Sequence, residues 1–147
     1  MQVFRFQKIS TQILCIFLVF AVISCKKSKN HPVPSIPFDI TVYINLPSYS
    51  NLQAVGGWAY VSGGSKGIVV YRKSQDEFVA FDRHSPAENG SCEEPLVCDP
   101  DNFLQLNDSC SGAKFSLLDG SIISGSEFGL RQYQTWWDGS TSLRIYN

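Results

Sequence analysis

Three cysteines and one histidine in the second half of the chain could support metal or redox chemistry. They are Cys92, Cys98, Cys110 and His84. Structural zinc sites usually take thiolates from pairs that only two to four residues separate. Here five residues separate Cys92 from Cys98, and eleven separate Cys98 from Cys110. The spacing therefore argues against zinc, and we expect no metal site.

Two other kinds of site need residues that this chain arranges poorly. Ser85 follows His84 directly, but neighbouring residues of an extended chain point to opposite sides, and no G-x-S-x-G elbow occurs. The acidic and amide residues between Asp99 and Asp108 do not follow the spacing of an EF-hand loop. Pro100-Asp101-Asn102 is instead typical of a turn. We therefore predict no catalytic residues and no calcium site.

The first 24 residues have the organisation of a secretory signal peptide. Arg5 and Lys8 precede an uninterrupted apolar run, residues 13–23, which is too short to cross about 30 Å of hydrocarbon. The run ends in Val22-Ile23-Ser24-Cys25, which resembles a bacterial lipobox, in which the cysteine is lipidated and becomes the new N-terminus. The sequence thus predicts a lipid-anchored protein of the bacterial cell envelope, at the periplasmic or outer-membrane face, with the membrane as a partner.

Residues 25–37 are predicted to be the lipidated cysteine and a tether. Three prolines stiffen this stretch toward the extended polyproline conformation, and we expect His31 within it to be exposed. The net charge of the whole chain is −1, which provides no basic field for nucleic acid. In the oxidising envelope, two of the three remaining thiols would form a disulfide and one would stay free.

Residues 38–147 predict one all-β domain. Ile40, Val42, Ile44 and Leu46 alternate with polar residues, as expected of a strand with one buried face. Further short apolar runs, separated by turn residues, occur at 56–61, 67–72, 77–82, 103–106, 114–117, 130–136 and 142–146. The pattern favours an antiparallel β sandwich or a partly open barrel.

The order of the later segments resembles the Rieske iron–sulfur domain, particularly small Rieske-like lipoproteins of Bacteroidota-type bacteria. The resemblance covers roughly residues 40–146. It rests on Phe78-Val79-Ala80-Phe81-Asp82-Arg83, on the stretch from Cys110 to Gly120, on Ser124-Gly125-Ser126, and on Leu130-Arg131-Gln132-Tyr133. It implies a Rieske-like fold in which two loops hold a [2Fe–2S] cluster.

The chain departs from that family at every cluster-ligand position. A Rieske cluster takes two thiolates and two imidazoles, one of each from each loop. The matching positions hold Ser85 and Ala87 in the first loop, and Asp108 and Ser111 in the second. None is a cysteine or a histidine. We therefore expect a degenerate member of the family, with two former cluster-binding loops and no [2Fe–2S] cofactor.

The resemblance also implies a disulfide, because many Rieske proteins join their two loops by one. The second-loop cysteine of that bridge maps onto Cys110, with Cys92 as its expected partner and Cys98 as the alternative. The spacing of the cysteines does not decide between the two. If Cys92 is the partner, we expect Cys98 to be a small buried residue in a strand that follows Leu96 and Val97.

Function is predicted only in outline. Of the adjacent Trp136 and Trp137, one should face the core and the other the solvent. The outward ring and His84 offer a possible binding surface for an envelope protein or a glycan. We expect a non-catalytic accessory lipoprotein with a binding or structural role. The alternative is a redox protein that uses a thiol–disulfide couple or an atypical cluster.

Overall fold

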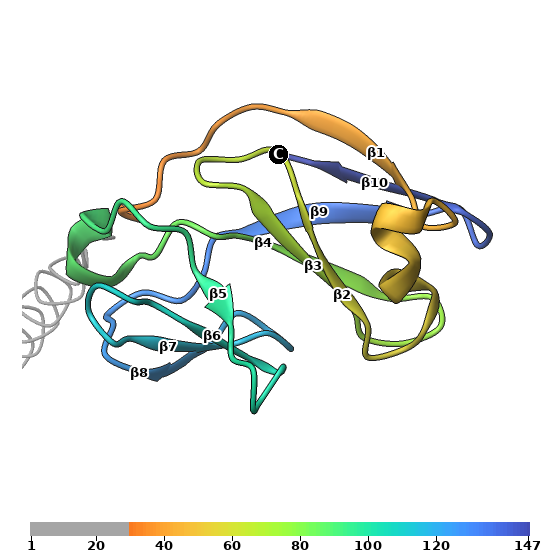
Figure 1. Cartoon of the computed structure of the whole chain (residues 1–147). Helices are drawn as coiled ribbons and strands as arrows, with labels where there is room; N and C mark the ends of the chain where they lie inside the picture. The colour runs from red at the N-terminus through yellow and green to blue at the C-terminus, as the bar shows by residue number, and fades with distance from the viewer. Residues whose placement is uncertain (1–29) are drawn as a thin grey trace, which may run out of the picture. The chain divides into compact units, whose positions relative to one another are not determined.

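Ten short antiparallel strands form two sheets in the part of the chain that the computed structural model describes, residues 30–147 (Figure 1). The larger sheet has six strands in the order β1-β10-β9-β4-β3-β2 and forms a half-barrel. Its strands are β1 (Asp39–Tyr43), β2 (Trp58–Val61), β3 (Ile68–Arg72), β4 (Phe78–Asp82), β9 (Gln132–Trp137) and β10 (Ser142–Tyr146). The predicted all-β class is confirmed. The predicted lipidation of Cys25 and the signal peptide lie outside the described residues.

A four-stranded sheet is inserted between β4 and β9. Its strands follow one another in space as they do along the chain: β5 (Val97–Cys98), β6 (Gln105–Asn107), β7 (Lys114–Ser116) and β8 (Ile122–Ser124). Two 3₁₀ helices complete the domain, η1 (Pro47–Gln53) after β1 and η2 (Ala87–Gly90) after β4. The proline that opens η1 suits a first turn, where a missing N–H costs nothing.

Side chains of the larger sheet alternate between its two faces only in part of that sheet. In β1, β9 and β10 one face is buried and the other exposed, so that Leu143 is buried while Arg144 and Trp136 are exposed. All five residues of β3 and all five of β4 are buried. Strands that are covered on both faces read as continuous apolar runs, which is the pattern found at 68–71 and 78–81.

Two hydrophobic cores explain this difference. Ile68, Val70, Phe78 and Ala80 face a first core, shared with buried residues of β1, β9 and β10. The alternate residues of these two strands, Val69, Tyr71, Val79 and Phe81, face a second core. They share it with residues in or next to the four-stranded sheet, including Leu106, Phe115 and Leu117. Each such side chain contributes about 1.5–3 kcal/mol when fully buried. The small sheet is therefore fixed against the centre of the large one.

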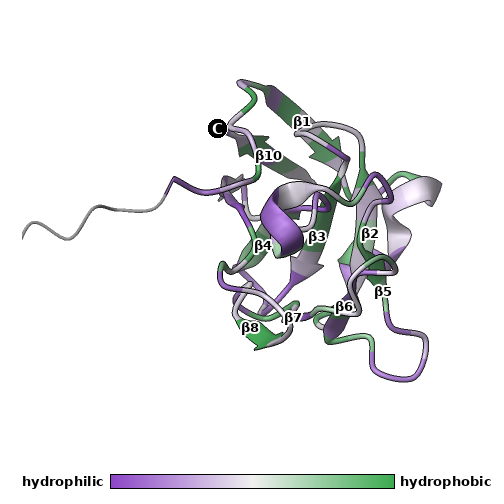
Figure 2. Ribbon diagram, turned by 90° about the vertical axis from the view of Figure 1, so that its left-hand side faces the viewer, coloured by the Kyte–Doolittle hydropathy of each residue, from purple (hydrophilic) through white to green (hydrophobic). Residues whose placement is uncertain are grey.

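Strand positions follow the sequence prediction closely where a strand has a buried face. The exception is β8, whose three residues are all exposed although two are isoleucines, so that no alternation reveals it (Figure 2). The 3₁₀ helix η1 contributes its buried Leu52 to the first core. No helix among residues 30–147 combines the length and the apolar character needed to span a bilayer.

Residues 31–33 pack on the domain instead of forming part of a free tether, whereas residues 34–37 are exposed. Val33 is fully buried, and its carbonyl oxygen accepts bonds from Nε and Nη2 of Arg131 at 2.9 and 2.6 Å. His31 is only partly exposed, and its Nε2 donates to the carbonyl of Gly129 at 2.9 Å. The expectation that His31 is exposed was therefore wrong, because contacts with residues about a hundred positions away hold it. The packed unit begins at His31 and not at Phe38.

Candidate functional site at two connecting loops

Two loops meet at one end of the four-stranded sheet. The first loop, residues 83–96, connects β4 to β5, and the second loop, residues 108–113, connects β6 to β7. A backbone hydrogen bond closes the base of the first loop, with Leu96 N donating to the Arg83 carbonyl at 2.7 Å. The Arg83 side chain adds a bond from Nε to the Leu96 carbonyl at 2.8 Å. The loop is thus anchored at both ends.

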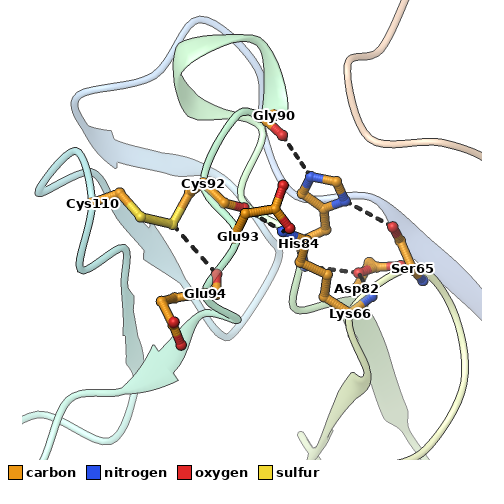
Figure 3. Close-up of polar contacts among 9 residues, drawn as sticks. All are labelled: Ser65, Lys66, Asp82, His84, Gly90, Cys92, Glu93, Glu94 and Cys110. Atoms are coloured by element: carbon orange, nitrogen blue, oxygen red, sulfur yellow. Dashed lines mark hydrogen bonds and ion pairs between the residues drawn. A yellow bond between two sulfur atoms is a disulfide. The ribbon is translucent and has the colours of Figure 1, made fainter.

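A disulfide between Cys92 and Cys110 joins the two loops (Figure 3). Their Cα atoms lie 5.8 Å apart, within the range that an unstrained backbone allows. Cys92 is buried and Cys110 is exposed. Cys98 is a free, partly exposed thiol in β5, so the pairing implied by the resemblance is confirmed in preference to Cys98–Cys110. Burial raises the pKa of the Cys98 thiol, which disfavours its reactive thiolate form.

Asp108 organises the second loop from within. Its Oδ1 accepts backbone bonds from Cys110 at 2.8 Å and Ser111 at 3.3 Å, and its Oδ2 accepts the Ser111 hydroxyl at 2.8 Å. Burial acts to raise the pKa of Asp108, but these bonds and one from Ser85 of the first loop outweigh it, so that the pKa lies below its usual value. The carboxylate is therefore held as an anion that ties one loop to the other.

The four positions that the resemblance assigns to cluster ligands present no nitrogen or sulfur ligand. Ser85 is fully buried, and its hydroxyl oxygen accepts the backbone N–H of Ala87 at 3.2 Å. Ala87 packs in the second core. Asp108 and Ser111 bond to each other, as described above.

The sulfurs of Cys92 and Cys110 do lie near the Asp108 carboxylate, with all three ligand atoms within 4.8 Å of one another. A cysteine binds a metal ion as its thiolate, however, and two sulfurs that are bonded to each other are not thiolates. This donor set does not suit a cluster that takes two thiolates and two imidazoles.

A buried carboxylate beneath the first loop joins three segments of the chain. Asp82, at the end of β4, is fully buried. Its Oδ2 accepts the Tyr133 hydroxyl at 2.5 Å and the Ser65 N–H at 2.6 Å. Its Oδ1 accepts the N–H groups of His84 at 2.7 Å and Lys66 at 3.2 Å. Four donors therefore satisfy this carboxylate, as a buried charge requires.

Gly64 allows the β2–β3 turn to approach this carboxylate. Its φ of +61° is unfavourable for other residues. In addition, a Cβ atom there would lie 2.5 Å from Oδ2 of Asp82 and 2.6 Å from the Tyr133 hydroxyl. Both the conformation and the close approach require glycine.

His84 and Lys66 extend the network from Asp82 to the disulfide (Figure 3). The His84 ring is buried; its Nδ1 lies 2.8 Å from the Ser65 hydroxyl, and its Nε2 donates to the Gly90 carbonyl at 2.8 Å. The Lys66 ammonium donates to the Cys92 carbonyl and pairs with Glu93 at 3.1 Å. The prediction of His84 as part of a binding surface was therefore wrong, because both ring nitrogens serve the fold.

The same contacts bear on whether His84 could act as the base for a catalytic serine. His84 pairs with Ser65, from the β2–β3 turn, and not with its sequence neighbour Ser85. A catalytic base needs a ring nitrogen that can exchange a proton with a substrate, yet the Gly90 carbonyl takes the other nitrogen. Neither of the two grooves described for residues 30–147 is lined by Ser65 or His84. The Ser65–His84 pair therefore connects two loops.

The two tryptophans divide between core and solvent as predicted. Trp136 is 58% exposed on the outer face of the larger sheet, opposite Arg144 of β10. Trp137 packs against the first core, with its ring 5.0 Å from that of Phe78 and 5.5 Å from the guanidinium carbon of Arg72. Of the binding surface predicted from sequence, only Trp136 is available to a partner.

Sequence reasoning missed the network around Asp82. Tyr133 is 51 residues away and Ser65 is 17 residues away along the chain, so no local pattern connects them. The one usable signal was the charge of Asp82 at the end of a run that is otherwise apolar. No protein-family model matches this sequence, and no curated protein is similar enough to it to count as a relative.

Proposed function

We propose that this chain is a lipid-anchored accessory protein of the bacterial envelope, with a Rieske-like domain in which a disulfide replaces the metal cluster. The supporting observation is the bridge between Cys92 and Cys110. This bridge joins the two loops that the resemblance identifies as former cluster-binding loops. It uses the pair of cysteines that the resemblance implies. The all-β architecture agrees with the resemblance at a coarser level.

The residues present do not suit a [2Fe–2S] cluster, so no electron transfer through one is assigned to the protein. Asp108 and His84, the central polar side chains of the two loops, have internal partners: Ser111 and two backbone amides bond to Asp108, while Ser65 and Gly90 bond to His84. These bonds hold the two loops in one conformation. A binding or structural role on a rigid frame is the function this arrangement supports best.

Fatty-acid labelling tests the lipid anchor. The full-length chain is produced in a bacterium that grows with an alkyne-bearing fatty acid, and the purified protein is analysed for incorporated label. We expect label in the wild type and in Cys15→Ala, because Cys15 belongs to the predicted signal peptide, and none in Cys25→Ala. Label that persists in Cys25→Ala, or a wild type without label, would overturn the anchoring.

A thiol–disulfide couple is a second candidate, favoured by the exposure of Cys110. An exposed cysteine allows a small thiolate to approach one sulfur, whereas structural disulfides resist reduction by the glutathione pool. Equilibration in glutathione buffers of graded potential separates these roles. A bridge that opens within the glutathione range would support the redox candidate, and one that stays closed would support the structural role.

A further inference from the structure

An open groove of about 670 Å³ lies beside η1 and the edge strand β2. Its volume falls within the roughly 300–1,000 Å³ that is usual for small-molecule sites. Trp58 of β2 and Phe103 of the β5–β6 turn line it on the aromatic side. Ser50, Asn51 and Gln53 of η1 line it on the polar side. The sequence analysis did not single out this groove.

The lining combines aromatic rings with neutral hydrogen-bonding groups and carries no charge. Phe103 is 52% exposed, so its ring is accessible to a ligand in the groove. The amides of Asn51 and Gln53 can each donate and accept. A ligand that matches such a lining has an apolar face and several hydroxyl groups, but no phosphate, carboxylate or ammonium group. A pyranose ring has this combination.

The polar wall of the groove is held in place before any ligand arrives. Nε2 of Gln53 donates to the Ile44 carbonyl at 3.2 Å, which orients its amide. The buried guanidinium of Arg72 donates through Nη1 to the carbonyls of Gln53 at 2.7 Å and Leu52 at 3.1 Å. Gly57 permits the wall to approach β2, since a Cβ there would lie 1.7 Å from the Asn51 carbonyl oxygen.

Trp58, on the aromatic side of the groove, is also held in place. The Trp58 ring lies 4.9 Å from that of Tyr60, which accepts the Cys98 N–H at 2.8 Å. The guanidinium carbon of Arg83 lies 3.6 Å from the centre of the Tyr60 ring. Walls that lose little freedom on binding reduce the entropic cost of holding a ligand.

We propose that this groove binds a neutral saccharide, with one sugar face on Trp58 and Phe103 and ring hydroxyls on Asn51 and Gln53. The inference rests on the proposed binding role and names its ligand class. A phosphorylated or acidic ligand finds no cation in the lining, and a lipid chain offers the amides no hydrogen-bonding group. The exposed Ile123 of β8 lies outside this groove and serves as a comparison.

Isothermal titration calorimetry on the full chain in detergent tests the proposal, with cellobiose, maltose and N,N′-diacetylchitobiose as probes. We expect saturable binding of at least one of these sugars at a single site. Phe103→Ala and Asn51→Ala should each weaken that binding by about tenfold or more. Both side chains lie at the surface, and an unchanged melting temperature establishes that each variant is folded. Ile123→Ala, at an exposed position of β8 outside the groove, is the control and should bind as the wild type does.

Three outcomes would overturn the saccharide site. These are no binding of any probe up to about 10 mM, binding that survives both groove substitutions, and binding that Ile123→Ala abolishes. None of them bears on fatty-acid labelling at Cys25 or on iron content. A failure of this inference is thus distinguishable from a failure of the proposed function.

Discussion

The Tyr133 hydroxyl of β9 donates a hydrogen bond of 2.5 Å to Oδ2 of Asp82, a buried residue at the end of β4. The bond joins two paired strands, one of which precedes and the other follows the four-stranded sheet along the chain. The same carboxylate accepts the N–H of His84, the second residue of the first loop. This pair therefore fixes the larger sheet at the point where the chain leaves and re-enters it.

Tyr133→Phe should destabilise the domain by about 1–3 kcal/mol, because it leaves a buried charge with one donor fewer. The free energy of unfolding from urea titration at neutral pH measures the effect. Tyr43→Phe is the matched control, since Tyr43 is 50% exposed on β1, and it should change stability by less than about 0.5 kcal/mol. Equal effects of the two substitutions would contradict the role of the bond.

Stability should also fall at alkaline pH in a way that depends on Tyr133. Burial and the neighbouring Asp82 raise the pKa of the Tyr133 hydroxyl above 10 in the folded protein. The unfolded chain therefore loses this proton at a lower pH than the folded protein does. The stabilisation that Tyr133 provides is complete below about pH 10 and declines as the pH rises beyond that. The stability difference between wild type and Tyr133→Phe should shrink as the pH rises above about 10. A constant difference would refute this assignment.

Removal of the disulfide should cost about 2–4 kcal/mol of unfolding free energy, given the 18-residue separation of its cysteines. The double variant Cys92→Ser, Cys110→Ser avoids a mispaired thiol. Cys98→Ser keeps the bridge and should unfold nearly as the wild type does. If reduction lowers the unfolding free energy of the wild type but not that of the double variant, the loss of stability belongs to this bridge. A similar loss in Cys98→Ser would contradict the assignment.

Asp108→Asn should weaken the second loop and change its response to acid. The folded pKa of Asp108 is lowered, so its contribution is present above the unfolded value near 3.9 and is lost as the pH falls through the folded value. We expect a loss of about 1–3 kcal/mol at pH 7 that disappears under strongly acidic conditions. Chemical denaturation across that pH range measures it. A loss that persists unchanged in acid would instead indicate a packing effect.

The sequence is informative about this fold wherever burial is one-sided or continuous. Alternation at Ile40 and Val42 and the apolar runs of β3 and β4 identify strands directly, because their side chains meet a core. The exposed strand β8 leaves no such pattern. The docking of Val33 and His31 depends on Arg131 and Gly129, which are far along the chain, so a proline-rich stretch looked like a free spacer.

The candidate site was predictable only as a set of loops. The resemblance gave the pairing of Cys92 with Cys110, which spacing alone left open. The bond between His84 and Ser65 was beyond sequence reasoning, because the serine comes from the β2–β3 turn, 19 residues earlier along the chain. The groove near Phe103 was missed for the same reason, since its walls come from β2, η1 and the β5–β6 turn.

The iron and acid-labile sulfide content of the chain, purified without oxygen, is the most direct test of the central claim. That claim is that a covalent bridge between Cys92 and Cys110 replaces a metal cluster in joining the two loops. The account predicts background levels of both elements, no visible absorption, and a Cys92–Cys110 cross-linked peptide in the digest. Iron and sulfide in stoichiometric amounts, released together when the two loops are altered, would contradict it.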